Sequence, residues 1–395
     1  MSPTGRVPVP AEILEIARTL EEAGFEAWCV GGALRDALLE GRHADFDLAT
    51  SASPQDVQRL FRRTAPIGVD HGTVGVIDRH RVMHEVTTFR RDVRTDGRHA
   101  VVEFGASLEE DLARRDFTIN AIAYHPLREE WRDPFGGERD LHAGVVRAVG
   151  DPAARFREDY LRVLRAIRFA ARFGFAIEPA TWRAAREASG GLKQLSAERV
   201  RDEWFKGLRT ARELEALLRL WHESGAAAAW LPGLRVPGTD PVPSAALSAP
   251  PRDPVLLTVA LTEDPATLLR RLRASNAEID RAEASVAGPA QPEERGMAGV
   301  RRWMAAAGRS VDDLVALHRL RHGEDPVWLE TVRAIRERGD PLTRGELAVT
   351  GRDLEALGYS GRSIGDTLAA LLEQVLEDPS ANSRERLLEI ARTRA

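Results

Sequence analysis

Two aspartates, Asp45 and Asp47 in the segment DFDLAT, are the residues of this chain best suited to metal chemistry. They alternate with Phe46 and Leu48, as in a half-buried strand, so both carboxylates are expected on one face. Two carboxylates at that spacing suit Mg²⁺, a hard cation that prefers oxygen ligands. Paired acids on a strand are also common solvated features, so the pair alone leaves both interpretations open.

A glycine pair, Gly31 and Gly32, separates the apolar run FEAWCV from the helix-like segment ALRDALLEG. Backbone N–H groups of glycines at the start of a helix can approach a phosphate closely, and the helix dipole favours the anion. Arg35 follows one helical turn later. The segment therefore predicts a phosphate cradle beside the metal pair, although a tight turn alone would also explain the glycines.

A third group of candidate residues lies in LARRDFTINAIAY, residues 112–124. Here Arg115 can meet a phosphate, and the carboxylate of Asp116 can accept hydrogen bonds from ribose hydroxyls. The alternative is a buried salt bridge beside a core Asn120 whose hydrogen bonds are satisfied. The residues by themselves do not decide between the two.

The segment 157–175, REDYLRVLRAIRFAARFGF, predicts a helix with Asp159, Arg162, Arg165 and Arg168 on one stripe. Such stripes are usually solvated and paired within the helix. A second interpretation concerns bases: cytosine and adenine both present an amine donor beside a ring-nitrogen acceptor. An Asp159 acceptor next to an Arg162 donor complements that edge and mismatches uracil and guanine, so bases could be selected without a template.

The surrounding elements divide the chain into an α+β part and an all-α part. Helical spacing over 10–23 precedes the strand run FEAWCV, and further strands are expected at 72–77 and 82–89. Ser53-Pro54 is expected to be the N-cap and first residue of a helix that runs through Phe61. The polar stretch from 90 to 102 has no period and is expected to be a loop. From about residue 146 the pattern is helical with no further strand, and the proline-rich segment 232–254 marks the clearest break.

Composition narrows the class of protein. The 395 residues are 43% hydrophobic and 30% charged, which excludes a disordered or fibrous chain. No window suits a membrane span, and the first residues lack the apolar core of a signal peptide, so a cytoplasmic location is expected. The single cysteine, Cys29, excludes internal disulfides and thiolate metal clusters. The net charge is only -5, and all basic residues except Lys193 and Lys206 are arginine, which suits phosphate and base edges.

Six motifs in this order resemble those of the bacterial class II tRNA nucleotidyltransferases, the CCA-adding enzymes. They are VGGALRD (30–36), DFDLAT (45–50), PIGVDHGTVGV (66–76), HEVTTFR (84–90), RRDFTINAIAY (114–124) and EDYLRVLRAIRFAARFGF (158–175). The likeness extends through LSAERVRDEW (195–204). More weakly, residues 347–376 resemble the tRNA-binding tail of the family.

The resemblance implies a head with the DNA polymerase beta type nucleotidyltransferase fold, built on a mixed five-stranded sheet. An all-α neck, body and tail would follow. The expected divisions are 1–145 for the head, 146–210 for the base-reading neck, 211–300 for the body and 301–395 for the tRNA-binding tail.

The resemblance also implies residue roles. Asp45 and Asp47 would be catalytic and hold Mg²⁺, while Gly31, Gly32 and Arg35 would contact the triphosphate. Arg115 and Asp116 would bind the phosphate and the ribose, and Asp159 and Arg162 would recognise the base. Arg165 and Arg168 would support the nucleotide, and Glu85 is a further candidate carboxylate.

The expected function is template-independent addition of C, C and A to the tRNA 3′ end from CTP and ATP, with release of pyrophosphate by a two-metal mechanism. Residues 90–102 lack the tyrosine and the Arg-Arg-Pro usual in the family's flexible loop. Enzymes that add only A or only CC therefore stay open as alternatives. A poly(A) polymerase and a non-catalytic tRNA-binding scaffold are further alternatives. No protein partner and no membrane association are expected.

Overall fold

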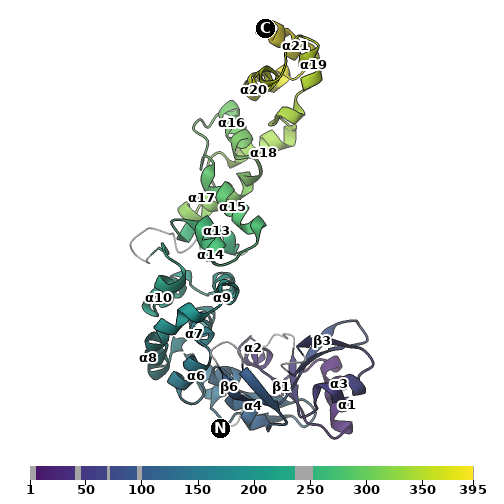
Figure 1. The fold of residues 1–395 in the computed structure, drawn as a ribbon, viewed down its shortest axis with the longest axis vertical. Helices are drawn as coiled ribbons and strands as arrows, with labels where there is room; N and C mark the ends of the chain where they lie inside the picture. Colours follow the sequence, from purple (N-terminus) through teal and green to yellow (C-terminus); the bar gives the residue numbers. More distant parts are fainter. Residues whose placement is uncertain (1–5, 41–45, 69–71, 96–99, 236–251, 395) are drawn as a thin grey trace. The chain divides into compact units, whose positions relative to one another are not determined.

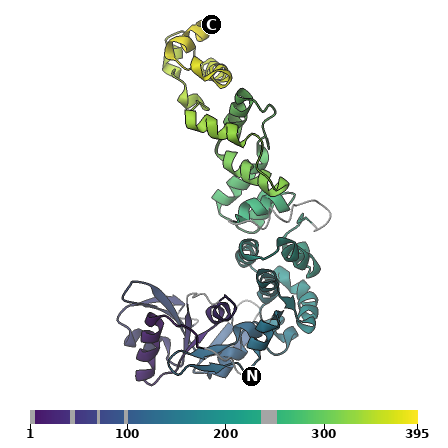
Figure 2. The same ribbon diagram turned by 180° about the vertical axis from the view of Figure 1, so that it is seen from behind.

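The computed structural model describes residues 6–40, 46–68, 72–95, 100–235 and 252–394. The chain forms two compact units, Met1–Pro232 and Gly233–Ala395. Figures 1 and 2 show the strands of the first unit from two sides, and the second unit as helices. The unit boundary lies at the start of the proline-rich segment, where the sequence predicts a break.

A mixed sheet of seven strands, in the order β3-β4-β5-β2-β1-β8-β9, is the frame of the first unit. Its central pair, β2 and β5, is parallel, and the other neighbouring pairs are antiparallel. In chain order the strands are β1 (Ala27–Val30), β2 (Asp47–Thr50), β3 (Thr64–Gly68), β4 (Thr73–Ile77), β5 (Met83–Thr88), β8 (Ala123–His125) and β9 (Glu130–Arg132).

The α+β head is confirmed, but its sheet has seven strands rather than the expected five. Three strands of the sheet, β3, β8 and β9, are not among those that the sequence pattern predicts. Strand β3 contains Pro66, which an edge strand tolerates because one side of its backbone needs no partner. Strand β9 has only three residues, too few to show alternation.

Alternation along the strands gives the sheet two different faces. On one face Leu48, Val74 and Val86 are buried against the helices α1 (Ala11–Glu22) and α3 (Pro54–Leu60). Helix α3 begins with the predicted Ser53 cap, which forms a capping box with Asp56. On the other face lie Asp47, Glu85 and Thr87, together with a second core that includes Trp28 and Val30.

Short helices connect these strands. They are α2 (Gly32–Glu40), α4 (Leu108–Ala113), the 3-10 turn η2 (Thr118–Asn120) and α5 (Gly137–His142). Helix α2 follows β1 directly, at Gly31 and Gly32, and η2 directly precedes the region of β8. Since β1 and β8 are neighbours in the sheet, the glycine turn and the RRDFTIN segment come together at one edge of the same site.

The prediction of a loop over 90–102 is wrong. Residues Arg90–Thr95 (β6) and Ala100–Phe104 (β7) form an antiparallel hairpin. Within it, Arg91 of β6 forms ion pairs with Glu103 of β7 and with Glu110. The dipeptide Asp96-Gly97, typical of hairpin turns, was the available clue, although it lies outside the described residues.

The helical part of the first unit contains α6 (Pro152–Glu158), α7 (Leu161–Phe173), α8 (Pro179–Glu187), α9 (Ala197–Thr210), α10 (Leu214–Glu223) and α11 (Ala226–Trp230), with the 3-10 segment η3 (Ala188–Gln194). A two-residue strand β11 (Ala176–Ile177) pairs with β10 (Val145–Val146), so one short strand does follow residue 146. The expected continuous helix over 157–175 is interrupted: Asp159 has extended dihedral angles and accepts from the N–H of Leu161 at 3.0 Å. This local hydrogen bond competes with the helix.

The second unit consists of helices in its described residues: α13 (Pro254–Leu261), α14 (Pro265–Arg271), α15 (Asn276–Ala287), α16 (Met297–Ala307), α17 (Val311–His322), α18 (Leu329–Arg338), α19 (Gly351–Glu355), α20 (Arg362–Glu377) and α21 (Arg384–Arg392), with 3-10 turns η4 (Gly308–Ser310), η5 (Arg344–Glu346) and η6 (Pro379–Ala381). Buried Arg301 donates to the carbonyls of Leu376 and Glu377 and pairs with Asp340 at 3.0 Å. These bonds fasten α16 to the end of α20. The finer division at 210 and 300 stays a prediction.

Candidate nucleotide-binding and catalytic site

A cavity of ≈660 Å³ lies on the β1-β2-β5 part of the sheet and reaches α7 and α9. Among the described residues that line it are nine arginines and only four acids. The arginines are Arg35, Arg90, Arg114, Arg115, Arg162, Arg165, Arg168, Arg172 and Arg199, and the acids are Asp47, Glu85, Asp116 and Asp159. This excess of positive charge suits a polyanion such as a nucleoside triphosphate.

The glycine turn lies at one wall of this cavity. Gly31 has φ +79°, a backbone conformation that residues with a side chain rarely adopt. A Cβ atom at Gly31 would also lie 3.2 Å from an arginine nitrogen of Arg115 and 3.9 Å from Asp47 Oδ2. The turn therefore keeps the backbone close to both charged groups, as a phosphate cradle requires.

Arg35 is buried, with 4% of its surface exposed, and several partners hold its guanidinium. It donates to Asn120 Oδ1 at 2.6 Å and to Asp36 at 2.7 and 2.9 Å. Its carbon Cζ also lies 5.0 Å from the ring centre of Phe169 and 4.8 Å from that of Phe173, both on α7. Burial lowers the pKa of Arg35, and the charge of Asp36 opposes that shift.

Asp36 connects this arginine to the helical part, because its second oxygen accepts from Arg172 of α7 at 2.9 Å. For the activity that the resemblance implies, we expect Asp36→Asn to raise the KM for CTP and ATP about tenfold, since Arg35 loses its charged anchor. Arg172→Ala should do the same, and the double variant should add little more, as expected for coupled neighbours. Steady-state kinetics at saturating tRNA measures this.

Glu223→Gln is the matched control, because Glu223 forms an exposed pair with Arg219. Equal KM values for the Asp36 variant and this control would refute the anchoring role. A thermal melt of each variant separates loss of folding from loss of nucleotide binding.

The carboxylates of the site come from adjacent parallel strands. Leu48 pairs with Val86 in the β2–β5 register, which places Asp47 and Glu85 side by side on the cavity face. Asp45 lies outside the described residues. Within the described part of the chain no group of three metal-ligating side chains is found. Two exposed oxygen ligands on one open face, next to a phosphate cradle, fit a hard divalent cation.

Asp116 is nearly buried, and three donors occupy its carboxylate. They are the N–H of Phe117 at 2.8 Å, Asn120 Nδ2 at 2.9 Å and Arg165 at 2.7 Å. Burial opposes its ionisation, but the charge of Arg165 and these hydrogen bonds outweigh burial and lower the pKa of Asp116. This geometry matches the buried salt bridge with a satisfied Asn120. A ribose contact by Asp116 stays a prediction.

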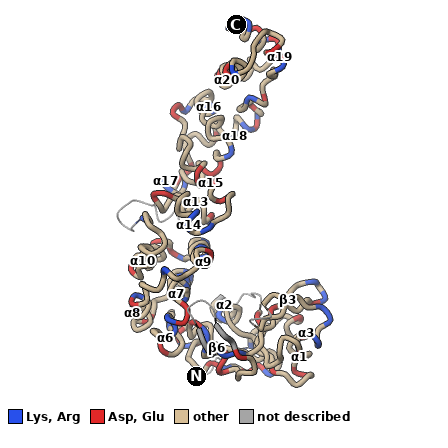
Figure 3. Tube along the Cα trace, viewed as in Figure 1, with Lys and Arg blue, Asp and Glu red and all other residues tan. Residues whose placement is uncertain are grey.

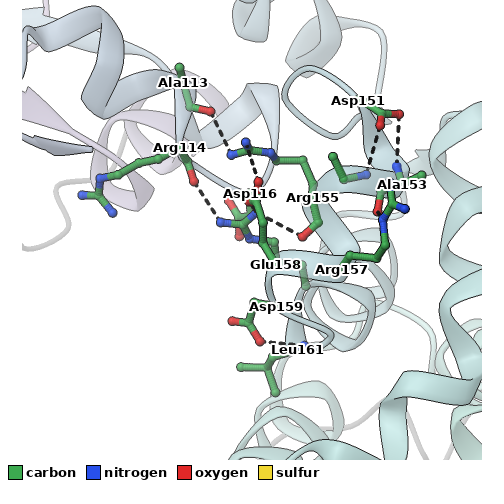
Figure 4. A network of polar contacts seen from close by, with 12 residues as sticks. Ala113, Arg114, Asp116, Asp151, Ala153, Arg155, Arg157, Glu158, Asp159 and Leu161 are labelled. Carbon is green, nitrogen blue, oxygen red and sulfur yellow. Dashed lines mark hydrogen bonds and ion pairs between the residues drawn. The ribbon is translucent and has the colours of Figure 1, made fainter. Parts of the chain in front are cut away.

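The two proposed base-reading residues precede and begin α7, and both are held by other residues. Figure 4 shows Asp159 with its hydrogen bond to Leu161. Asp159 accepts from Arg199 of α9 at 2.6 Å. Arg162 pairs with Glu158 at 2.7 Å and donates to the carbonyl of Arg114 at 3.0 Å. Asp159 is thus not part of the helical stripe that its spacing suggested, yet it lines the cavity beside Arg162.

Farther along α7, Arg165 and Arg168 face α9 as well as the cavity. Arg168 Nε donates to Glu203 at 2.5 Å, and both side chains are at most 10% exposed. Arg168 also lies over the ring of Phe169 at 4.2 Å. Apart from Arg162, which pairs with Glu158 four residues away, the stripe therefore consists of partly buried, long-range ion pairs rather than a solvated face, which contradicts the simpler interpretation of its spacing.

Comparison with known proteins places this site in a family. Residues 27–147 match the family described as Poly A polymerase head domain, and residues 174–236 match the probable RNA and SrmB-binding site of polymerase A. A CCA-adding enzyme of Limosilactobacillus fermentum is 35% identical over 390 residues, which are 95% of each chain. The chain belongs to the family of CCA-adding enzymes.

Other members of the CCA-adding family agree with this assignment. A CCA-adding enzyme of Anoxybacillus flavithermus is 46% identical over 197 residues, about half of each chain. The crystal structure of the Bacillus stearothermophilus CCA-adding enzyme in complex with CTP superposes with a TM-score of 0.81 at 33% identity, covering 97% of this chain and 98% of that one. The expected family and head fold are thereby confirmed.

Sequence reasoning about this CCA-adding family member missed several cavity residues. Arg199 lines the cavity and Glu203 accepts from Arg168, and both lie in ERVRDEW, where the sequence pattern alone indicates no role. Their charges at spacing four on α9 were the available clue. The local pattern places Phe169 and Arg172 on a helix, and nothing in it shows that Arg35 lies over the ring of Phe169 or that Asp36 accepts from Arg172.

Proposed function

We propose that this chain adds C, C and A to the 3′ end of tRNA from CTP and ATP, without a template, and releases pyrophosphate. The observation that carries the proposal is the cavity that joins carboxylates of β2 and β5 to a glycine turn, nine arginines and the Asp159–Arg162 pair. Relatives along nearly the whole chain are CCA-adding enzymes, one of them solved with CTP.

In the proposed reaction the 3′-hydroxyl oxygen of tRNA forms a bond to the α-phosphorus of the nucleotide. The bond from that phosphorus to the bridging oxygen breaks, the hydroxyl loses its proton to solvent, and pyrophosphate leaves. Gly31, Gly32, Arg35 and Arg115 would hold the triphosphate and its departing charge. Asp159 and Arg162 would select the base, supported by Arg165 and Arg168.

We propose Mg²⁺ as the metal, held by Asp47 with Asp45 and assisted by Glu85. Bound divalent ions would lower the pKa of the attacking hydroxyl and neutralise charge on the phosphates. The residues of the chain orient this chemistry: Gly31 keeps the backbone beside Asp47, and the β2–β5 register keeps Glu85 next to Asp47.

Incorporation of radiolabelled CTP and ATP, tested separately and together, is the deciding experiment. The tRNA substrates should lack CCA, lack only A, or be complete. We expect two cytidines on the first substrate with CTP alone, one adenosine on the second with ATP alone, and nothing on the third.

Three other outcomes correspond to the alternatives. Adenosine addition without cytidine addition would favour an A-adding enzyme, and arrest after two cytidines would favour a CC-adding enzyme. Long adenosine tracts would favour a poly(A) polymerase. Binding of tRNA with no addition of any nucleotide would favour a scaffold.

The tRNA-binding role of the tail, 301–395, is part of the proposal. Deletion from residue 340 would remove Asp340 and α20 and leave the buried Arg301 without these partners. Point variants are therefore the cleaner test. We expect Arg352→Glu with Arg362→Glu, at exposed positions near the positive-φ glycines Gly358 and Gly361, to weaken tRNA binding about tenfold. Filter binding at fixed salt measures this.

The nucleotide KM should stay unchanged in that tail variant, because the cavity belongs to the other unit. Arg132→Glu with Arg139→Glu, an equally large charge change at two exposed positions in the head, is the comparison. Full tRNA affinity of the tail variant would show that this surface of the tail is structural only.

No helix among the described residues is both long and apolar enough to cross a membrane. We also propose a cytoplasmic location for this activity. The division into head, neck, body and tail at residues 145, 210 and 300 is a further part of the proposal.

A further inference from the structure

Strands β4 and β5 present a face to solvent that the proposed roles do not use. We call it the β4–β5 face and define it by Thr73, Gly75, Met83 and Thr87, next to Glu85. Thr73 and Thr87 are half-buried, while Met83 is 47% exposed. The pairings Thr73–Thr87 and Gly75–Glu85 show that these residues share the face of Asp47.

The position of this face follows from the strand order β4-β5-β2-β1-β8. The phosphate cradle follows β1, and Arg115 lies just before β8, so the triphosphate would lie on that side of Asp47. An in-line attack brings the nucleophile from the side opposite the leaving group. The RNA end must then approach over β5 and β4, which is the other side of Asp47.

We propose that the β4–β5 face seats the 3′-terminal nucleotide of the RNA acceptor. This inference rests on the proposed function and names the surface that would present the attacking hydroxyl. The hydroxyl oxygens of Thr73 and Thr87 lie 3.0 Å apart at the edge of the cavity, where they can bind the ribose or its phosphate.

Met83 supplies the surface for the base. Its sulfur lies across Gly75 so closely that a Cβ atom at that position would be 2.7 Å from Sδ. The glycine thus lets a flexible, polarisable thioether lie flat beside Glu85. An unpaired base can stack on such an apolar platform irrespective of its identity, which suits an acceptor end that changes with each addition.

Positive charge borders the Met83 end of the face. Arg79 and Arg81 lie in the turn between β4 and β5, and Arg63 directly precedes β3. Arg79 is exposed but pairs with Glu12 and Glu15 of α1, which packs on the other face of the sheet. Arg63 and Arg81 are exposed as well. Figure 3 shows basic positions gathered at this end of the head, beside β3 and α3. The phosphates preceding the terminal nucleotide would find complementary charge there.

The first test compares Met83→Glu with Val82→Glu. Val82 is the adjacent residue and is 49% exposed, so both variants place the same charge at an equally accessible position. We expect Met83→Glu to raise the KM for tRNA ending in CC about tenfold, and to leave the KM for ATP within about twofold. Val82→Glu should change neither value beyond about twofold, since its side chain lies outside the face.

The second test needs no turnover. A tRNA with 4-thiouridine as its last nucleotide is photo-crosslinked to the unmodified protein in the absence of nucleotides. We expect the crosslinked peptide to contain Met83, as read by mass spectrometry, and Met83→Glu to lose this crosslink.

A crosslink confined to α7 or α9, or equal tRNA KM values for the two glutamate variants, would overturn the inference. Failure of the proposed function looks different: the unmodified protein would add no nucleotide to any tRNA. The crosslink would then still report whether an RNA 3′ end occupies the β4–β5 face.

Discussion

Asp47→Asn should reduce nucleotide addition by about 10³-fold or more, because it removes a charge that a catalytic divalent ion needs while keeping the shape of the side chain. Asp47 is exposed at the start of β2, so the free energy of unfolding should change by no more than about 0.5 kcal/mol. Binding of tRNA should persist. Extension of tRNA lacking CCA, followed over a titration of Mg²⁺, measures the effect.

Two further variants serve as references for the size of the Asp47→Asn effect. Glu85→Gln should cost about tenfold, since Glu85 lies beside Asp47 but on the neighbouring strand. Glu109→Gln, at an exposed acid of α4, should be neutral. Substantial Mg²⁺-dependent turnover by a protein carrying asparagine at both Asp45 and Asp47 would show that the metal site lies elsewhere.

Asp159→Asn should reduce the selection of CTP and ATP over UTP and GTP by about 10- to 100-fold, the range for one base-reading contact. The carboxylate can only accept, which suits the amines of cytosine and adenine, whereas an amide also offers a donor to the oxygens of uracil and guanine. Misincorporation of labelled UTP and GTP into tRNA lacking CCA, relative to CTP, is the measurement.

The single substitution is cleaner than exchanging Asp159 and Arg162. Exchange would place an arginine against Arg199 and an aspartate against Glu158, so both existing ion pairs would become repulsions. Asp202→Asn is the control, because Asp202 is exposed on α9 near Arg199. Unchanged base selection in an active Asp159→Asn enzyme would show that another residue determines the selectivity.

The neck residues also show how binding and base selection can be connected. Arg35 of the phosphate side lies between Asp36 and the rings of Phe169 and Phe173, and α7 begins directly after Asp159. The helix that carries Arg162 and Arg165 is therefore in contact with the arginine expected to hold the triphosphate. A nucleotide that displaces Arg35 would act on α7 through packed rings and the Asp36–Arg172 pair.

Local chemistry in the sequence determined much of this protein. The alternation in DFDLAT predicted β2 with Asp47 facing away from Leu48, and Ser53-Pro54 predicted the capped start of α3. These features depend on residues within one or two turns of each other, so periodicity and capping rules reach them. The family resemblance rested on such motifs, and full-length relatives confirm it.

Contacts between distant segments were decided only by the tertiary structure. Asp159 leaves the helix because it caps Leu161 and meets Arg199, 40 residues away, and Asp116 is held by Arg165 from 49 residues away. In the β6–β7 hairpin, Arg91 likewise pairs with Glu103, 12 residues away, and with Glu110. Charge pairs leave no period in a sequence, since each arginine could pair with many acids, and only chain packing selects the partner.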